Sequence, residues 1–321
     1  MTLRLWLLFG IALVSLIAGP AGAQYPNRAV RVVPHAPAGS GPDMIARLVA
    51  ANLQESLGQP VVVENRAGAN GNIAGEFVAK SPADGYTLLV ATDAQFTINP
   101  HVYAKLPFDW NRDLAPVASL ATESFKLVVA SSVPAKTVAE FIAHARSLGK
   151  PMFYGSAGNG SQHHLTMELF KERAGISLTH IPYKGGGAAT TQALLAGEIQ
   201  ATIGGAAVDV QVKAGKLRAL GMAGATRSPR YPDLPTIAET LPGFEMSPWY
   251  GLFTPTGTPA DVVTRLRTEV NKYLAQPDAQ AKINATGPEV WISTPDAFAA
   301  AIRRDLDRNG KLVKALGISL D

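Results

Sequence analysis

Two glycine-rich segments carry the clearest potential for chemistry in this sequence. The first reads PAGSGPD at residues 37–43, and the second reads GSAGNGS at residues 155–161. Each follows a short apolar run and precedes a helical pattern, so each predicts a loop that opens a helix. The first amides of a helix lack partners inside it and the helix dipole makes that end positive, so carboxylates and phosphates bind there. Two such loops favour an anion site over two unrelated turns.

The donors expected to face the anion are backbone amides from both loops. Pro42 suits the first helical position but has no N–H, and Asp43 is interpreted as a cap because its charge would repel an anion. Ser161 either caps its helix or contacts the ligand. The donor candidates are Ala38, Gly39, Ser40 and Gly41 in the first loop, and Asn159, Gly160 and Ser161 in the second.

Other chemistry-bearing residues are weaker candidates. Thr92 and Gln95 follow an apolar run, where another loop should reach the same site. His163 and His164 are adjacent and diverge on a helix, so they make a poor metal pair and are predicted to lie on a solvated helix face, from which His163 could reach the ligand. Residues 305–310 begin like a calcium loop, but Leu316 stands at its twelfth position, so no metal site is predicted.

Signatures of enzymes and cofactors are absent from the sequence. It contains no G-x-S-x-G, H-E-x-x-H or G-x-x-x-x-G-K-[ST] motif and no cysteine. We therefore predict no catalytic residue and no cofactor. Positive charges are scattered rather than clustered with aromatic residues, which argues against nucleic acid as a partner.

Alternating strand and helix patterns must position the two loops. After the first loop, Ile45, Leu48, Val49, Leu53 and Leu57 form one apolar helix face that ends before Gly58. Short apolar runs before and after this helix predict a parallel sheet covered on both faces. The same alternation restarts near residue 125, so we expect two α/β lobes. Ligands bind at the carboxyl ends of strands in such sheets, which places the loops across a cleft.

The first residues indicate where the protein acts. Arg4 precedes an apolar stretch over residues 5–17, and Ala21-Gly22-Ala23 follows it. This pattern predicts a signal peptide over residues 1–23 that is cleaved after Ala23. We therefore expect an exported, periplasmic protein.

Over residues 25–318 the chain resembles the substrate receptors of tripartite tricarboxylate transporters, the Bug family. The resemblance implies the type II periplasmic-binding-protein fold, with two doubly wound lobes and a ligand cleft between them. It also implies two crossing strands, near Phe125–Ala130 and near Trp249–Phe253. Lobe 1 should comprise residues 24–124 and 246–321, and lobe 2 residues 125–245. The similar stretches include VVPHAPAGSGPDMIARLVA, YGSAGNGSQHHLTMELFK, HIPYKGGGAATTQALLAGEI and PWYGLFTPTGTP.

Family receptors hold a carboxylate with loop amides, partly through water. By position this implicates residues 38–41, Thr92 and Gly158 to Ser161, together with Gln95, His163 and Tyr183. The family often carries an acidic segment after the third strand of lobe 2. Here Gly204 and Gly205 stand in that place, with Gly205 expected beside the ligand. Loss of that acid argues against a ligand with an ammonium group.

The implied function is an extracytoplasmic receptor that captures a small organic carboxylate by lobe closure. The ligand would be a di- or tricarboxylate or an aromatic acid, and the membrane subunits of a tripartite transporter would receive it from a monomeric receptor. Two alternatives stay open: a ligand-sensing co-receptor for a periplasmic signalling domain, and a periplasmic enzyme on the same scaffold.

Overall fold

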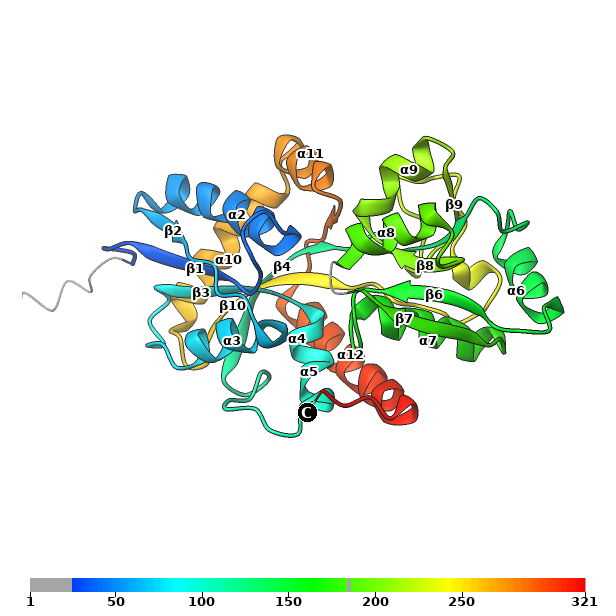
Figure 1. Cartoon of the computed structure of the whole chain (residues 1–321). Coiled ribbons are helices and arrows are strands. Elements are labelled where there is room, and N and C mark those ends of the chain that lie inside the picture. The colour runs from blue at the N-terminus through cyan, green and yellow to red at the C-terminus, as the bar shows by residue number, and fades with distance from the viewer. Residues whose placement is uncertain (1–24, 184–185, 321) are drawn as a thin grey trace, which may run out of the picture.

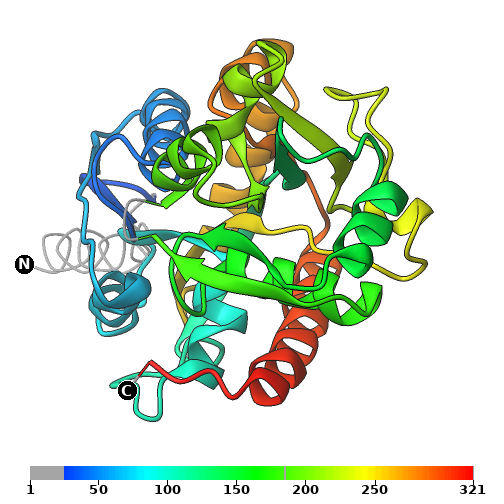
Figure 2. The ribbon, with the colours of Figure 1, turned by 45° about the vertical axis from the view of Figure 1, so that its right-hand side comes forward.

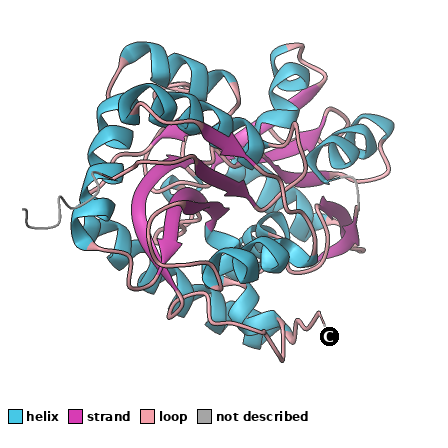
Figure 3. Cartoon of the chain, turned by 90° about the vertical axis from the view of Figure 1, so that its left-hand side faces the viewer, coloured by secondary structure: helices cyan, strands magenta, loops and turns pink. Residues whose placement is uncertain are grey.

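The described residues, 25–183 and 186–320 of the computed structural model, form two α/β lobes side by side (Figure 1). Lobe 1 is built around a six-stranded sheet and lobe 2 around a five-stranded sheet. The predicted signal peptide lies outside the described residues. Helices cover the strands of both lobes, as expected for a doubly wound fold (Figure 3).

The sheet of lobe 1 has the strand order β11-β4-β10-β3-β1-β2. β1 is parallel to β2 and β3, whereas β10 is antiparallel to β3 and β4. The prediction of a purely parallel sheet is therefore wrong here, because β10 enters from lobe 2 in the opposite direction. The strands are β1 (Val30–Pro34), β2 (Val61–Val63), β3 (Thr87–Thr92), β4 (Leu114–Thr122), β10 (Trp249–Pro255) and β11 (Glu289–Val290).

The helix after the first loop follows the predicted apolar face. Ile45, Val49 and Leu53 are fully buried against the sheet, and Gly58 ends the helix in a left-handed conformation with φ 67°. The helices of lobe 1 are α2 (Gly41–Leu57), α3 (Asn72–Ala79), α4 (Asp93–Thr97), α5 (Asn99–Val102), α10 (Ala260–Leu274), α11 (Pro277–Ala285) and α12 (Pro295–Leu316), with a 3-10 turn at Ala69–Gly71.

Lobe 2 has the strand order β7-β6-β8-β5-β9, and its elements follow the predicted alternation. β6 is parallel to β7 and β8, while β5 is antiparallel to β8 and β9. Its strands are β5 (Lys126–Ala130), β6 (Met152–Ser156), β7 (Leu178–Pro182), β8 (Ala201–Gly204) and β9 (Leu217–Met222). Its helices are α6 (Val138–Ser147), α7 (Gln162–Ala174), α8 (Gly186–Ala196) and α9 (Asp209–Lys213), with 3-10 turns at Ala206–Val208 and Ile237–Glu239.

Two chain passages join the lobes and lie beside each other. The first follows β4 and the second precedes β10, and the Glu123 amide donates to the Pro248 carbonyl at 2.7 Å. β5 belongs wholly to the second sheet and β10 to the first, so the passages lie just before these strands. The exact lobe boundaries at residues 124/125 and 245/246 stay a prediction.

Of the C-terminal helices, α10 packs on α2 and β4 and α12 on α4 and β4, and α12 also contacts α7 of lobe 2. Beyond α12 the chain runs back to α5, where the Leu320 amide donates to the Val102 carbonyl at 2.9 Å (Figure 2). None of the helices in residues 25–183 and 186–320 combines the length and the apolar character needed to span a bilayer.

Candidate functional site

A cavity of about 810 Å³ lies between the two lobes. Loops that follow β1 and β3 in lobe 1 meet loops that follow β6 and β8 in lobe 2, at the carboxyl ends of these strands. The residues that line it are His35, Ala36, Gly39, Ser40, Gly41, Pro42, Met44, Asn70, Thr92, Ala94, Gln95, Asn99, Glu123, Phe125, Ala157, Gly160, Ser161, Gln162, His163, Gly187, Ala188, Gly205, Ala206, Ala207, Tyr250 and Thr286.

Most of the sequence-predicted site residues meet at this cavity. Four do not line it: Ala38, Gly158, Asn159 and Tyr183. The Tyr183 hydroxyl donates to Glu198 Oε2 at 3.3 Å on the surface of lobe 2. The predicted residues that do line the cavity are Gly39, Ser40, Gly41, Thr92, Gln95, Gly160, Ser161, His163 and Gly205.

The first loop uses two of its predicted donors internally. The Gly39 amide donates to Asp43 Oδ2 at 2.8 Å, and the Ser40 amide donates to the Pro37 carbonyl at 3.2 Å. The prediction that both amides face the ligand is therefore wrong. The Gly41 amide has no partner among the described residues, so it is the donor that this loop presents to the cavity.

Asp43 anchors the loop from inside lobe 1. Its Oδ2 also accepts from Arg47 Nε at 3.0 Å, and its Oδ1 accepts from Asn65 Nδ2 at 2.8 Å. Burial raises the pKa of Asp43, but the hydrogen bonds from Arg47, Gly39 and Asn65 outweigh burial and lower the pKa overall. Asp43 is absent from the cavity lining, and the prediction that it caps α2 is wrong, because Ser40 is the N-cap residue and Asp43 accepts from the Gly39 amide in the loop before the helix.

The second loop is held by a buried histidine. Ser161 caps α7 by accepting the His164 amide at 3.3 Å, and the Gly160 amide donates to His164 Nδ1 at 3.2 Å. The Ser161 amide donates to the Gly158 carbonyl at 3.2 Å, so the prediction that the Gly160 and Ser161 amides face the ligand is wrong. The His164 ring stacks on His180 with 4.0 Å between centroids. The predicted solvated face is therefore wrong for His164, because α7 packs into lobe 2. Burial, followed by the neighbouring His180, lowers the pKa of His164 to about 4.

His163 lies on the cavity wall. Its ring packs against Phe125 at 4.5 Å between centroids, and both residues line the cavity. Burial lowers the pKa of His163 to about 4, so the ring is neutral at pH 7 and brings no positive charge. The amides of Gln162 and His163, at the start of α7, have no partners among the described residues and complement the Gly41 amide across the cleft.

Thr92 and Gln95 are hydrogen-bonded to each other. Gln95 Oε1 accepts from the Thr92 amide at 2.9 Å and from the Thr92 hydroxyl at 2.8 Å. Gln95 Nε2 donates to the Asn70 carbonyl at 3.0 Å, and Asn99 Nδ2 donates to the same carbonyl at 3.0 Å. These side chains therefore fix the cavity wall around Asn70.

Sequence reasoning missed the residues contributed by the first passage between the lobes and by the start of β10. Glu123, Phe125 and Tyr250 line the cavity, and the Tyr250 hydroxyl donates to Glu123 Oε1. A Cβ placed on Gly205 would lie 3.4 Å from Glu123 Oε2. An acid therefore borders the cleft beside Gly205, and the expectation that this place lacks one is wrong. Burial raises the pKa of Glu123, and the Tyr250 hydrogen bond and Lys126 partly oppose that rise.

The described lining of the cavity carries no formal positive charge. Among the described residues that line it there is no lysine or arginine, and Glu123 is its one carboxylate. A bound carboxylate would be held by the amides of Gly41, Gln162 and His163, which act as oriented dipoles.

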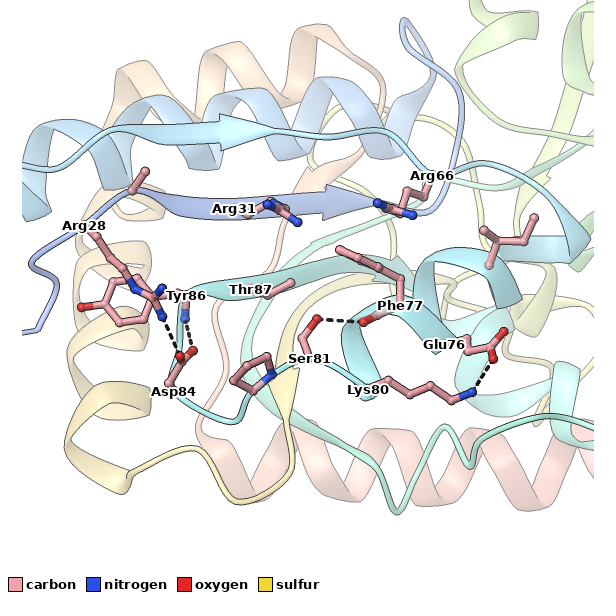
Figure 4. Close-up of a pocket in the computed structure, with 13 residues that line it drawn as sticks. Arg28, Arg31, Arg66, Glu76, Phe77, Lys80, Ser81, Asp84, Tyr86 and Thr87 are labelled. Carbon is pink, nitrogen blue, oxygen red and sulfur yellow. Dashed lines mark hydrogen bonds and ion pairs between the residues drawn. The ribbon is translucent and has the colours of Figure 1, made fainter.

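A second cavity of about 690 Å³ lies on lobe 1 beside β1, β3 and α3 (Figure 4). It is rich in cations, but each has an acidic partner. Arg28 pairs with Asp84 at 2.8 Å and Lys80 with Glu76 at 2.6 Å. Arg31 and Arg66 both pair with Glu64. Paired, solvent-facing charges make this cavity a weaker anion site than the cleft.

Comparison with known proteins identifies the family. The family model of the tripartite tricarboxylate transporter family receptor matches residues 45–318. The chain belongs to this receptor family. Protein BugT of Bordetella pertussis is 35% identical to the receptor over 322 residues, covering 99% of this chain and 98% of BugT. The family is one of solute-binding receptors and not of enzymes.

Solved structures support the two-lobe fold of the receptor. The R. palustris protein Rpa4515 with adipate has a TM-score of 0.80 and 37% identity, covering 92% of this chain and 99% of that one. MatC from Rhodopseudomonas palustris with bound malate has a TM-score of 0.74 and 31% identity, covering 90% of this chain and 100% of MatC. Both of these neighbours hold small organic carboxylates.

Proposed function

We propose that this receptor binds a small organic carboxylate in the cavity between its lobes. The observation that carries the proposal is the convergence of unpartnered amides from α2 of lobe 1 and α7 of lobe 2 on one cavity. Donors on both lobes stabilise the closed arrangement over the open one, because only closure brings them to the same carboxylate. The adipate and malate of its neighbours support this ligand class.

The receptor would act in the periplasm as a monomer and hand its ligand to the membrane subunits of a tripartite tricarboxylate transporter. The family match supports this role. A deletion strain should lose uptake of the ligand that stabilises the purified protein, and the plasmid-borne gene should restore it. Unchanged uptake would contradict the transport role and favour the sensing role.

The binding proposal is tested by replacing Gly41 with alanine. The added Cβ would lie 2.9 Å from the Tyr250 hydroxyl, so it crowds the cavity beside the free amide. The readout is the melting temperature with mono-, di- and tricarboxylates and with aromatic acids, because a ligand bound only to the native state raises it.

We expect one or more of these acids to stabilise the wild-type receptor, and Gly41→Ala to weaken that binding roughly tenfold or more, which corresponds to about 1.4 kcal/mol. Gly149→Ala is the matched control, because a Cβ at Gly149 meets nothing within 4 Å. An absence of stabilisation by every acid, or equal binding by Gly41→Ala, would contradict the proposal.

A further inference from the structure

Glu123 and Tyr250 form a hydrogen-bonded pair in the wall of the cleft. The Tyr250 hydroxyl donates to Glu123 Oε1, and the two residues are 127 positions apart in the sequence. Tyr250 is held in the sheet of lobe 1, where it pairs with Ala121 of β4 and with Thr92 of β3. Glu123 directly follows β4, and its amide donates to the Pro248 carbonyl at 2.7 Å. The pair therefore joins a strand of lobe 1 to the first passage between the lobes.

Two glycines leave room in front of this pair. A Cβ on Gly41 would lie 2.9 Å from the Tyr250 hydroxyl, and a Cβ on Gly205 would lie 3.4 Å from Glu123 Oε2. Gly41 carries the free amide of the first loop, and Gly205 follows β8 of lobe 2. The pair consequently lies within reach of a small molecule whose carboxylate rests on the loop amides.

The oxygens of the pair act as acceptors toward the cavity. The tyrosine hydrogen is used in the bond to Glu123, and Glu123 Oε2 has no hydrogen-bond donor among the described residues. Lys126, which acts on Glu123 by its charge, does not line the cavity: it is 1% exposed and pairs with Asp209 at 2.7 Å. A second ligand carboxylate placed here would meet acceptors and a like charge, with no cation in the described lining.

We propose that the Glu123–Tyr250 pair is a specificity subsite for a hydrogen-bond donor, so that the ligand carries an ammonium or hydroxyl group in addition to its carboxylate. The inference rests on the proposed function, since the loop amides must hold the carboxylate end. It narrows the ligand class away from unsubstituted dicarboxylates and toward amino or hydroxy acids.

The test compares ligands that differ at one end only. Isothermal titration calorimetry would measure 6-aminohexanoate, 6-hydroxyhexanoate, adipate and hexanoate, and the four-carbon set of 4-aminobutanoate, 4-hydroxybutanoate, succinate and butanoate. For at least one of the two chain lengths we expect the amino or hydroxy acid to bind roughly tenfold or more tightly than both the diacid and the plain acid. A charge-assisted hydrogen bond to Glu123 accounts for a difference of this size.

The variant Glu123→Gln keeps an oxygen that can accept the Tyr250 hydrogen but removes the charge. It should lose most of the preference for the amino acid over the plain acid. Glu55→Gln, an exposed site on α2, removes the same charge away from the cavity and should keep the preference. Should Glu123→Gln fail to fold, Tyr250→Phe replaces it, with a reduced preference for the hydroxy and amino acids expected.

The outcomes separate this inference from the proposed function. Tighter binding of the diacid at both lengths, or an unchanged preference in the folded variant, would overturn the donor subsite while leaving carboxylate binding intact. Failure of every acid to bind would overturn the proposed function and the subsite with it.

Discussion

Gln162 donates from Nε2 to Oδ1 of Asp93 and so joins the first residue of α7 to the first residue of α4. The same oxygen of Asp93 faces the Trp249 amide, at 3.4 Å, at the start of β10. One carboxylate therefore connects lobe 2, lobe 1 and the strand that follows the second passage between them.

We predict that Asp93→Asn stabilises the receptor at neutral pH. Burial, followed by the charge of Asp305, raises the pKa of Asp93 well above its usual range. Between the unfolded pKa and the higher folded pKa the folded state binds more protons, so stability falls as pH rises through this interval. Asparagine keeps the Oδ1 acceptor and removes the charge. The melting temperature at pH 7 to 8, followed by circular dichroism, should rise by a few degrees.

The matched control for Asp93→Asn is Asp233→Asn, which removes a carboxylate from an exposed loop position. It should leave the pH dependence of the wild type in place. A lower melting temperature of Asp93→Asn at every pH would show that the ionised carboxylate stabilises the junction, contrary to this account.

We predict that Asp43 stabilises the folded conformation of the first loop. Asp43→Ala removes the acceptor of the Gly39 amide, of Arg47 and of Asn65, so the free energy of unfolding should fall by about 1–3 kcal/mol. Because the folded pKa of Asp43 lies below its usual value, its stabilisation is present above the unfolded pKa and is lost as pH falls through the folded pKa. Urea unfolding at pH 7 and pH 3 should therefore show a smaller difference in the free energy of unfolding between variant and wild type at pH 3.

The control for Asp43→Ala is Glu55→Ala, which should change the free energy of unfolding little. A loss of equal size in Glu55→Ala would point to a general effect on α2.

His164 should make the second loop sensitive to acid. Its folded pKa of about 4 lies below the usual value of 6.5, so the unfolded chain takes up the proton first and stability falls as pH drops from about 6.5 to 4. Protonation also removes the Nδ1 acceptor of the Gly160 amide. His164→Gln should flatten the melting temperature across this interval, with a residual slope from His35 and His163, whose pKa values burial also lowers to about 4. His144→Gln, on α6, should retain the wild-type slope, and an equal slope in both variants would exclude His164 as the source.

Local patterns predicted the helices and loops well. The apolar spacing from Ile45 to Leu57 and the glycine at 58 are properties of a single segment, and α2 forms as they indicate. The strand β4 was missed because it contains Pro116 and because its pairing partner β10 lies more than a hundred residues later. Because β4 is not part of the predicted sheet, Glu123, which directly follows it, is not predicted as a site residue either.

The free amides could not be chosen from the sequence for a related reason. Composition indicated that glycine-rich loops present N–H groups, but which groups are occupied depends on side chains that fold back. Asp43 takes the Gly39 amide, and His164 takes the Gly160 amide. Such contacts depend on rotamers and packing, which no spacing rule specifies.

The position of β10 between β3 and β4 governs the order in which the chain can fold. β10 begins at Trp249, after every strand of lobe 2 has been synthesised, and until it arrives β3 and β4 expose unpaired edges. Lobe 2 draws its sheet from the continuous segment between Lys126 and Met222 and can form first. Lobe 1 must wait for pairing across more than 120 residues, a topology of high contact order that slows folding. A chain truncated before β10 would keep every strand of lobe 2 beside an open, aggregation-prone half-sheet of lobe 1.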